Sequence, residues 1–250
     1  MAGEWTGGPR GGAPPQTWPS GNRVLDLLPE ADAALLTPLL EPLTLQSGHI
    51  VGQTGEAMTC AFFPCAGTVF SLVVDCDEGR AAEAVSIGQE GQLGPELIGL
   101  PGLGHVLVQM PGRALRIQAD ALAHVAADSA PLRDALEMQR KALMVRLVQA
   151  AVCSALHPVE ARASFWLLLA QDRREQPDLP VTQELLAAML GVRRTTVTRV
   201  MAQLTDRGLI RHRRSRVTVI DRPGLEAVAC GCHKSLLTRL RRVAPALYPD

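Results

Sequence analysis

Aromatic residues are scarce in this chain. Phenylalanine, tryptophan and tyrosine make up 3% of its 250 residues, so leucine, valine and alanine must fill most of any hydrophobic core. No continuous apolar run approaches the roughly 20 residues that a membrane-spanning helix needs, and the N-terminus lacks the basic and apolar pattern of a secretion signal. These absences predict a cytoplasmic protein that does not contact a membrane.

Motifs of catalysis are also missing. The sequence has no Gly-x-Ser-x-Gly nucleophile elbow, no phosphate-binding loop and no His-Glu-x-x-His zinc motif. We therefore predict that the chain is not an enzyme, and we assign no catalytic residue.

Six cysteines stand at irregular spacing, which is more typical of reduced thiols than of a disulfide framework. Cys60, Cys65 and Cys76 lack the compact spacing of iron–sulfur ligands. Cys230-Gly-Cys232 with the histidine that follows resembles a metal clip, but its tetrahedral site stays incomplete unless another subunit contributes. The sequence therefore predicts no metal ligand and no cofactor, and a redox or metal role for these cysteines stays open.

The formal net charge is zero, which by itself argues against a nucleic-acid partner. The charges are unevenly distributed, however. Residues 1–130 hold 5 of the 25 basic and 14 of the 25 acidic residues, so residues 131–250 hold 20 and 11. Residues 181–222 contain nine arginines and three acids, as expected of a module that displaces counterions from phosphates. The C-terminal half is therefore the candidate nucleic-acid-binding part.

Two short amphipathic helices around Gly191 are predicted between Val181 and Leu204. Each has apolar residues at helical spacing on one face. The opposite face of the second helix carries arginines and threonines, which suit guanine edges, other bases and phosphates in a major groove. These candidate DNA-binding residues are Arg193, Arg194, Thr195, Thr196, Thr198 and Arg199.

A basic β-hairpin is predicted directly after these helices. Gly208 ends the second helix, and residues 216–220 alternate as a strand does. The hairpin adds further candidate DNA-binding residues, namely Arg211, His212, Arg213, Arg214 and Arg216. Together these segments predict a winged helix-turn-helix that binds double-stranded DNA.

The N-terminal half has a different composition. Residues 1–22 contain six glycines and four prolines and predict a disordered tail. Short helices are expected from Val24 to Leu45, broken at Pro29, Pro38 and Pro42. Between Gly48 and Gln118, glycines separate short apolar runs typical of a small antiparallel β-roll, whose mouth is a candidate sensor site. We place this sensor domain at residues 23–128.

The longest uninterrupted helical stretch covers residues 129–157 and ends at His157-Pro158. Its apolar stripe either packs on its own domain or, as we favour, forms the seam of a two-stranded dimer. The predicted dimer-interface residues are Leu132, Leu136, Leu143, Leu147, Ala150 and Ala151. The DNA-binding domain then covers residues 158–235, and residues 236–250 are expected to form a C-terminal tail.

From about Leu25 to Cys232 the chain resembles the Crp/Fnr family of bacterial transcription regulators, named after the cyclic-AMP receptor and the fumarate-nitrate reduction regulator. The most specific part is Leu179 to Arg199, and the order of the parts agrees. The resemblance implies an α+β fold with a cupin-like, cyclic-nucleotide-binding β-roll, a long dimerisation helix and a C-terminal winged helix-turn-helix. It also implies that Arg194 and Arg199 read guanines, and that Thr182 caps the first helix and touches a phosphate.

The sensor departs from family members that bind cyclic AMP. Those members carry a Gly-Glu pair for the ribose and, about ten residues later, an Arg-Ser pair for the cyclic phosphate. This chain has Gly94-Pro-Glu96 and then His105-Val-Leu-Val-Gln109. A buried cyclic phosphate without a fixed cation would lose its main charge-assisted contacts, so cyclic-AMP binding of the usual kind is not expected. Gly91, Gly94 and Glu96 stay the candidate ligand-binding residues for an unknown effector.

The main hypothesis is a homodimeric transcription regulator that reads an inverted repeat under control of the roll. A rival hypothesis keeps DNA binding but makes the roll a structural domain or a contact for a protein partner such as RNA polymerase, so that the regulator is constitutive. Thr195 stands where the cyclic-AMP receptor has a glutamate, so the operator is expected to differ from that of the receptor.

Overall fold

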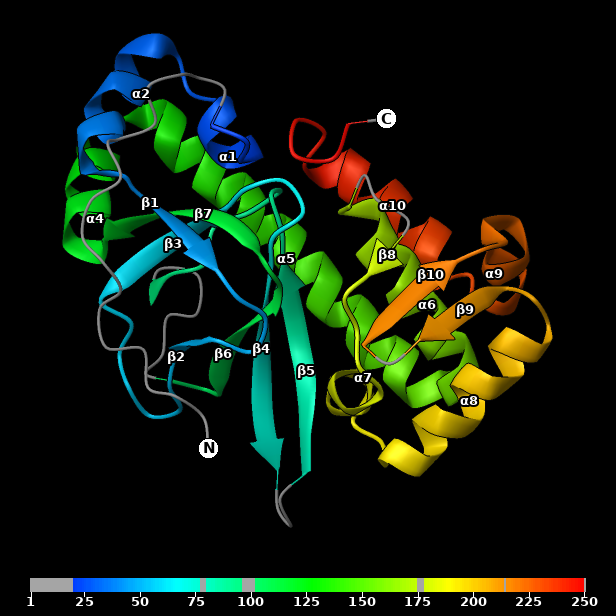
Figure 1. The fold of residues 1–250 in the computed structure, drawn as a ribbon. Helices are drawn as coiled ribbons and strands as arrows, with labels where there is room; N and C mark the ends of the chain where they lie inside the picture. The colour runs from blue at the N-terminus through cyan, green and yellow to red at the C-terminus, as the bar shows by residue number, and fades with distance from the viewer. Residues whose placement is uncertain (1–19, 77–79, 96–101, 175–177, 214, 250) are drawn as a thin grey trace. The chain divides into compact units, whose positions relative to one another are not determined.

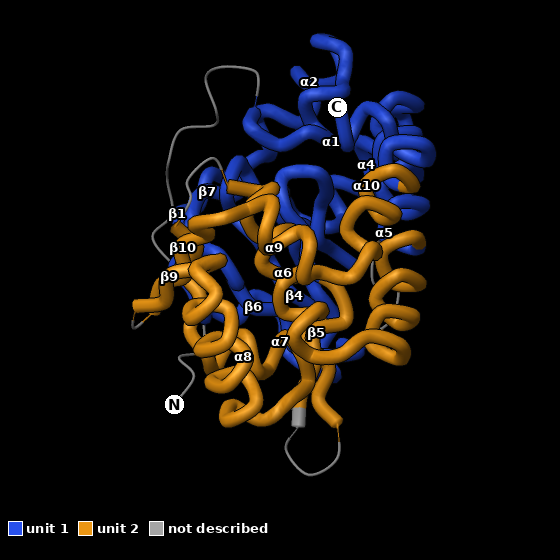
Figure 2. The backbone as a smooth tube through the Cα atoms, turned by 90° about the vertical axis from the view of Figure 1, so that its right-hand side faces the viewer, with its two compact units in different colours: residues 1–72, 86–144, 240–250 blue, residues 73–85, 145–239 orange. Residues whose placement is uncertain are grey.

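The computed structural model describes residues 20–76, 80–95, 102–174, 178–213 and 215–249. The chain divides into two compact units (Figure 2). Unit 1 contains residues 1–72, 86–144 and 240–250, and unit 2 contains residues 73–85 and 145–239. The candidate site residues Glu96 and Arg214 lie outside the described residues, as does most of the tail expected at residues 1–22. No described helix is long and apolar enough to span a bilayer.

Unit 1 begins with α1 (Arg23–Asp26), α2 (Glu30–Leu36) and the 3-10 helix η1 (Thr37–Leu39). The fully buried Asn22 caps α1, because its Oδ1 accepts hydrogen bonds from the backbone N–H groups of Val24 and Leu25. Its Nδ2 donates to the carbonyls of Pro64 and Gly91, at 2.8 Å each. Residues 20–22 are therefore ordered, which corrects the expected end of the tail.

Seven described strands form the β-roll (Figure 1). They are β1 (Glu41–Leu45), β2 (Ile50–Gly52), β3 (Cys60–Pro64), β4 (Val69–Cys76), β5 (Arg80–Ile87), β6 (His105–Met110) and β7 (Gly112–Gln118). One sheet has the order β1-β7-β3 and the other has the order β2-β6-β4-β5. The fully buried side chains of Phe63, Phe70 and Leu115 belong to the core of this roll.

Pro42 lies in a strand, although the sequence analysis expects it to break a helix. It pairs with Leu115 in the antiparallel ladder of β1 and β7. Because β1 is at the edge of its sheet, a residue without an N–H group is tolerated there.

Two helices follow the roll in sequence, α4 (Ala119–Asp128) and α5 (Ala130–Leu156). Ser129 separates them, and its Oγ accepts a hydrogen bond from the backbone N–H of Leu132 at 3.1 Å, as an N-cap does. The long predicted helix is thus confirmed as α5. The sequence analysis gives no separate helix to residues 119–128.

Unit 2 contains the elements of a winged helix-turn-helix, which confirms the predicted fold. Its helices are α6 (Val159–Asp172), α7 (Gln183–Leu190), α8 (Arg194–Asp206) and α9 (Arg222–Val228). Its small sheet has the order β8-β10-β9 and consists of β8 (Asp178–Leu179), β9 (Ile210–Arg213) and β10 (Arg216–Val219).

A last helix, α10 (Cys232–Val243), occupies much of the segment that the sequence analysis expects to be a tail. Leu236 and Leu240 are buried, and so is Leu247 beyond the helix. The four-residue spacing of the two helical leucines gives α10 one apolar face. This periodicity is the signal that the sequence analysis overlooked.

Candidate nucleic-acid interface

The first helix of the motif, α7, has defined caps at both ends. Thr182 Oγ1 accepts a hydrogen bond from the backbone N–H of Leu185 at 3.0 Å, as predicted. At the other end Gly191 adopts φ 64°, in the left-handed region that favours glycine. The chain can therefore turn within three residues and begin α8 at Arg194.

One face of α8 fixes the helix to its unit. The buried side chains on this face are Val197, Val200, Met201 and Leu204. α8 packs against α7, α6 and β9. Because this apolar face is covered, the opposite face is the one that remains free to meet another molecule.

The opposite face of α8 carries the predicted contact residues. Thr196 is half-buried, and the exposed residues are Arg193, Arg194, Thr195, Thr198 and Arg199. Arg193 is the N-cap residue of α8, but its side chain makes no capping hydrogen bond. The guanidinium groups and hydroxyls on this face are the donors that suit base edges and phosphates.

Gln183, the first residue of α7, contacts this face and was not selected from the sequence. Its Oε1 accepts a hydrogen bond from Thr198 Oγ1 at 2.7 Å, and the same hydroxyl lies 3.0 Å from the carbonyl of Arg194. The bond joins the start of α7 to the outer face of α8. The only signal for Gln183 in the sequence was its place as a polar residue directly after Thr182, the predicted cap.

The wing, defined as β9, β10 and the connection between them, alternates between exposed and inward-facing residues. Arg211, Arg213 and Arg216 are exposed. His212 is half-buried, and its Nε2 is buried without a hydrogen-bond partner among the described residues. His212 lies on the same side of β9 as the buried Ile210. The prediction that His212 contacts DNA is therefore corrected.

Polar contacts from α6 support α7 and α8. Arg162 Nη2 donates to the carbonyl of Leu190 at 2.7 Å, at the C-terminal end of α7. Arg207 Nη1 donates to Glu160 Oε1 at 3.1 Å, at the C-terminal end of α8. These contacts tie both helix ends to one element and limit how far the outer face of α8 can rotate.

A charged network lies around Asp172 at the end of α6. Arg222 Nη2 donates to Asp172 Oδ1 at 2.7 Å, and His233 Nε2 donates to Asp172 Oδ2 at 2.8 Å. Burial favours the neutral acid, but the hydrogen bonds from His233 and Arg222 outweigh it and hold the pKa of Asp172 below its ordinary value. The network joins α6 to the segments that follow the wing.

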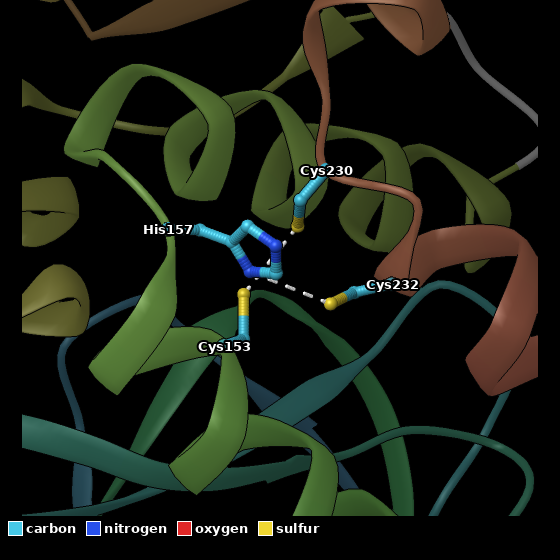
Figure 3. Close-up of side chains that lie close together, drawn as sticks. All are labelled: Cys153, His157, Cys230 and Cys232. Atoms are coloured by element: carbon cyan, nitrogen blue, oxygen red, sulfur yellow. Dashed lines mark hydrogen bonds between the residues drawn. The ribbon is translucent and has the colours of Figure 1, made fainter.

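Three cysteines and a histidine converge elsewhere in unit 2 (Figure 3). Cys153 Sγ lies 3.4 Å from Cys230 Sγ, and His157 Nδ1 lies 3.6 Å from Cys232 Sγ. Burial, followed by interactions with Cys230, raises the pKa of both Cys153 and Cys232. The sequence analysis singled out Cys230, Cys232 and the next residue, His233, but His233 pairs with Asp172 instead.

The candidate ligand residues of the roll are closely packed. A Cβ atom on Gly94 would lie 2.8 Å from the Cβ of Ala61, and one on Gly91 would lie 3.0 Å from Nε2 of Gln139. A side chain at position 94 would therefore clash with Ala61, and one at position 91 would crowd Gln139. Internal packing therefore explains these two glycines without a ligand, and their assignment as ligand-binding residues stays a prediction.

A hollow of about 430 Å³ opens at a different place in the roll. Its lining comes from residues 50–53, 56–60 and 62, around β2 and β3. The described residues that line it include Glu56 but no lysine or arginine. An anionic ligand would find no fixed cation among them.

The predicted dimer residues of α5 differ in exposure. Leu132 and Leu136 are buried inside the protomer, so they are not available to a second subunit, which corrects that part of the prediction. Leu143, Leu147 and Ala150 are half-buried and Ala151 is exposed. Large apolar side chains do stand open to solvent on this helix, at exposed fractions of 62% for Met144, 53% for Val148, 44% for Val152 and 73% for Leu156.

Comparison with known proteins identifies the same parts. Residues 161–228 match the family model of the Crp-like helix-turn-helix domain. Among curated proteins, none matches the sequence. The fold is similar to that of FixK2 from Bradyrhizobium japonicum, with a TM-score of 0.65 and 12% identity over 77% of this chain and 98% of that chain.

Two further solved structures have the same fold. A CRP/FNR-family transcriptional regulator from Thermus thermophilus has a TM-score of 0.62 and 21% identity, over 76% of this chain and 98% of that chain. The c-di-GMP responsive global regulator CLP of Xanthomonas campestris has a TM-score of 0.59 and 17% identity, over 76% and 98%. At such identities the likeness establishes the fold, and residue roles must come from the geometry.

Proposed function

We propose that the chain is a DNA-binding transcription regulator of the Crp/Fnr type that acts as a homodimer and reads an inverted repeat; the match of residues 161–228 to the Crp-like helix-turn-helix domain and the shared fold support this proposal. The observation that carries this proposal is the two-faced α8. Four of its apolar side chains are buried, whereas Arg194, Arg199 and Thr198 are exposed on the other side. A helix held in this way can place its guanidinium groups against base edges in the major groove.

In this proposal Arg194 and Arg199 read bases, and the other exposed residues position the domain. Arg193, Thr195 and the half-buried Thr196 lie near the start of α8, where phosphates flank a docked helix. Thr182 and the wing residues Arg211, Arg213 and Arg216 bind phosphates on either side. His212 is left out of this set because it faces inward.

The dimer seam is proposed at the exposed row on α5. Met144, Val148 and Val152 are spaced by four residues, and Leu156 continues the row to the end of the helix. A row of this kind on a 27-residue helix would be costly to leave in water and suits a second copy of the same helix. Two recognition helices held by such a seam would meet half-sites about 34–36 Å apart, one turn of DNA.

The roll is proposed as a sensor that does not bind cyclic AMP in the usual way. Gly91 and Gly94 are packed against Gln139 and Ala61. The hollow near β2 and β3 offers no cation among its described lining residues. An effector that enters this hollow would therefore be uncharged or would carry a positively charged group that the Glu56 carboxylate attracts.

A second candidate function is a constitutive regulator whose roll is structural or contacts RNA polymerase. The close packing around Gly91 and Gly94 favours it, because internal contacts explain these two glycines without an effector. In that case the amount of protein, or its partner, would set the response. DNA recognition by α8 is the same in both proposals.

Selection of binding sites from random DNA tests the proposal. The purified 250-residue chain would be used alone, with cyclic AMP and with c-di-GMP. We expect an inverted repeat to be enriched in every condition, with no gain from cyclic AMP. Enrichment that depends on cyclic AMP would contradict the proposal for the roll, and enrichment of single, unrepeated sites would contradict the dimer.

A further inference from the structure

We propose that Cys153, His157, Cys230 and Cys232 bind one structural metal ion of the zinc type. The ligand atoms of these four residues all lie within 4.8 Å of one another. Their side chains point toward a common centre, with Cys153 and His157 coming from one helix end and the other two from a second segment (Figure 3). All four residues belong to unit 2.

Two of the ligand-to-ligand distances are close to those around a single tetrahedral ion. With Zn–S bonds of about 2.3 Å and Zn–N bonds of about 2.0–2.1 Å, the edges of the tetrahedron are about 3.6–3.8 Å. The distance from Cys232 Sγ to His157 Nδ1 is 3.6 Å, and the Sγ atoms of Cys153 and Cys230 are 3.4 Å apart. A four-iron cluster has iron and sulfide between its thiolates and needs them farther apart.

Local backbone geometry brings each pair of ligands together. His157 follows the last residue of α5, and its backbone N–H donates to the carbonyl of Cys153 at 3.1 Å, so both side chains lie on one helix face. Cys230 and Cys232 flank a glycine at the start of α10. The ion would therefore link the end of α5 to the start of α10.

A second layer of contacts orients one of the ligands. The buried Gln149 donates from Nε2 to Cys232 Sγ at 3.1 Å. Arg239 Nη1 in turn donates to Gln149 Oε1 at 2.9 Å, which fixes the amide in this direction. Hydrogen bonds of this kind to a metal thiolate are a regular feature of zinc sites. Phe165 and Ala161 pack against the cysteines and limit the access of water.

The ligand set also determines the kind of ion and its role. Three thiolates and an imidazole are soft ligands, which select zinc over magnesium or calcium. Four protein ligands fill a tetrahedral ion and leave no position for a substrate, as in structural sites. A disulfide between Cys153 and Cys230 would need a sulfur distance near 2.05 Å and would leave Cys232 and His157 without a function.

Cobalt substitution tests this site in the 250-residue chain. Reduced, metal-free protein would be titrated with Co²⁺, whose visible spectrum reports tetrahedral geometry and thiolate bonds, and then with Zn²⁺. We expect one Co²⁺ per chain, a thiolate-to-cobalt band, and displacement by Zn²⁺. Cys153→Ser and His157→Gln should remove or strongly alter this spectrum, and Gln149→Leu should weaken Zn²⁺ binding about 10–100-fold.

Two control variants are available in the same chain. Cys65→Ser removes a buried thiol outside the cluster. His233→Gln removes the histidine that is adjacent in sequence but pairs with Asp172. Both should keep the full cobalt spectrum. Loss of the spectrum in His233→Gln but not in His157→Gln would overturn the assignment.

A measurement on the wild-type chain covers the case in which a variant does not fold. Zn²⁺ should protect Cys153, Cys230 and Cys232 from alkylation while the exposed Cys76 reacts. Alkylation of the three thiols at the same rate with and without Zn²⁺ would overturn the proposal. So would formation of a Cys153–Cys230 disulfide in the presence of Zn²⁺.

Discussion

The arginines of α8 and those of the wing are suited to different contacts with DNA. Arg194 and Arg199 belong to a helix whose apolar face is buried, so their side chains are presented at defined positions. Arg213 stands on a strand of the wing, which suits contact with the sugar–phosphate backbone. Substitutions on α8 should therefore change the preference for particular bases, whereas substitutions in the wing should change the affinity for all DNA sequences.

Replacing Arg199 by alanine should therefore cost about 1–3 kcal/mol of DNA binding and relax the preference at one base pair of each half-site. Arg213→Ala should weaken all sequences by a similar factor and flatten the dependence of affinity on salt. Binding isotherms on the selected site and on single-base variants check both effects. Identical behaviour of the two variants would show that α8 does not read bases as assigned.

The carboxylate of Asp172 should contribute to the stability of unit 2. Because its pKa in the folded state is below the unfolded value, this contribution is present above about pH 4 and is lost as the pH falls through the folded value. Asp172→Asn should lower the free energy of unfolding by about 1–3 kcal/mol at neutral pH. It should also reduce the loss of stability on acidification.

Urea unfolding of the wild type and of Asp172→Asn between neutral and acidic pH measures this contribution. Asp206→Asn, at an exposed position on α8, is the matched control and should leave stability nearly unchanged. An Asp172→Asn variant with wild-type stability at every pH would contradict the assigned role of the network.

Some residues of the site were predictable from the sequence and others were not. The spacing of apolar residues around Gly191 determines which side of α8 is buried, so Arg194 and Arg199 could be selected from periodicity alone. His212 could not be assigned, because basic composition does not reveal which face of a hairpin a residue occupies. Cys153 and His157 were missed because 73 or more positions separate them from Cys230.

At the scale of whole elements, α5 carries a row of large apolar side chains that are exposed to solvent. Its N-terminal part is buried at Leu132 and Leu136, whereas Met144, Val148 and Leu156 are exposed farther along. From the sequence, a single apolar stripe along this helix was expected to pack against one partner, the second subunit. The structure shows that the buried apolar side chains of the N-terminal part give way to exposed ones farther along the helix, which periodicity alone does not reveal.

A negative charge in the exposed row should therefore separate the dimer. Val148→Glu would place a carboxylate at the proposed seam, and we expect a monomer by sedimentation together with a loss of about 10²–10⁴-fold in affinity for an inverted repeat. Ser154→Glu, on an exposed position of the same helix, is the control and should remain dimeric. A Val148→Glu protein that stays dimeric would place the seam elsewhere.

Elements at the two ends of the chain show where element prediction failed. Pro42 suggested a helix break, but it lies in the edge strand β1. The sequence could not reveal this position, because only the order of strands in the sheet shows which strand lacks a neighbour on one side. By contrast, α10 follows directly from the spacing of Leu236 and Leu240 and could have been predicted.

At the scale of the whole molecule, the charges are segregated along the chain. Residues 181–222 contain nine arginines and three acids, although the formal net charge is zero. This basic module, the exposed row on α5 and a fold like that of the Crp/Fnr regulators support the same proposal. We propose that two copies of the chain together read two half-sites that face the same side of the DNA.

The most direct test of this proposal is the affinity of the 250-residue chain for its selected inverted repeat after base pairs are inserted between the half-sites. An insertion of about five base pairs turns one half-site by about half a helical turn to the opposite side of the duplex. The account predicts that this insertion reduces binding about as much as the loss of one half-site. Unchanged affinity would contradict the account, because it would mean that each winged helix binds its half-site independently.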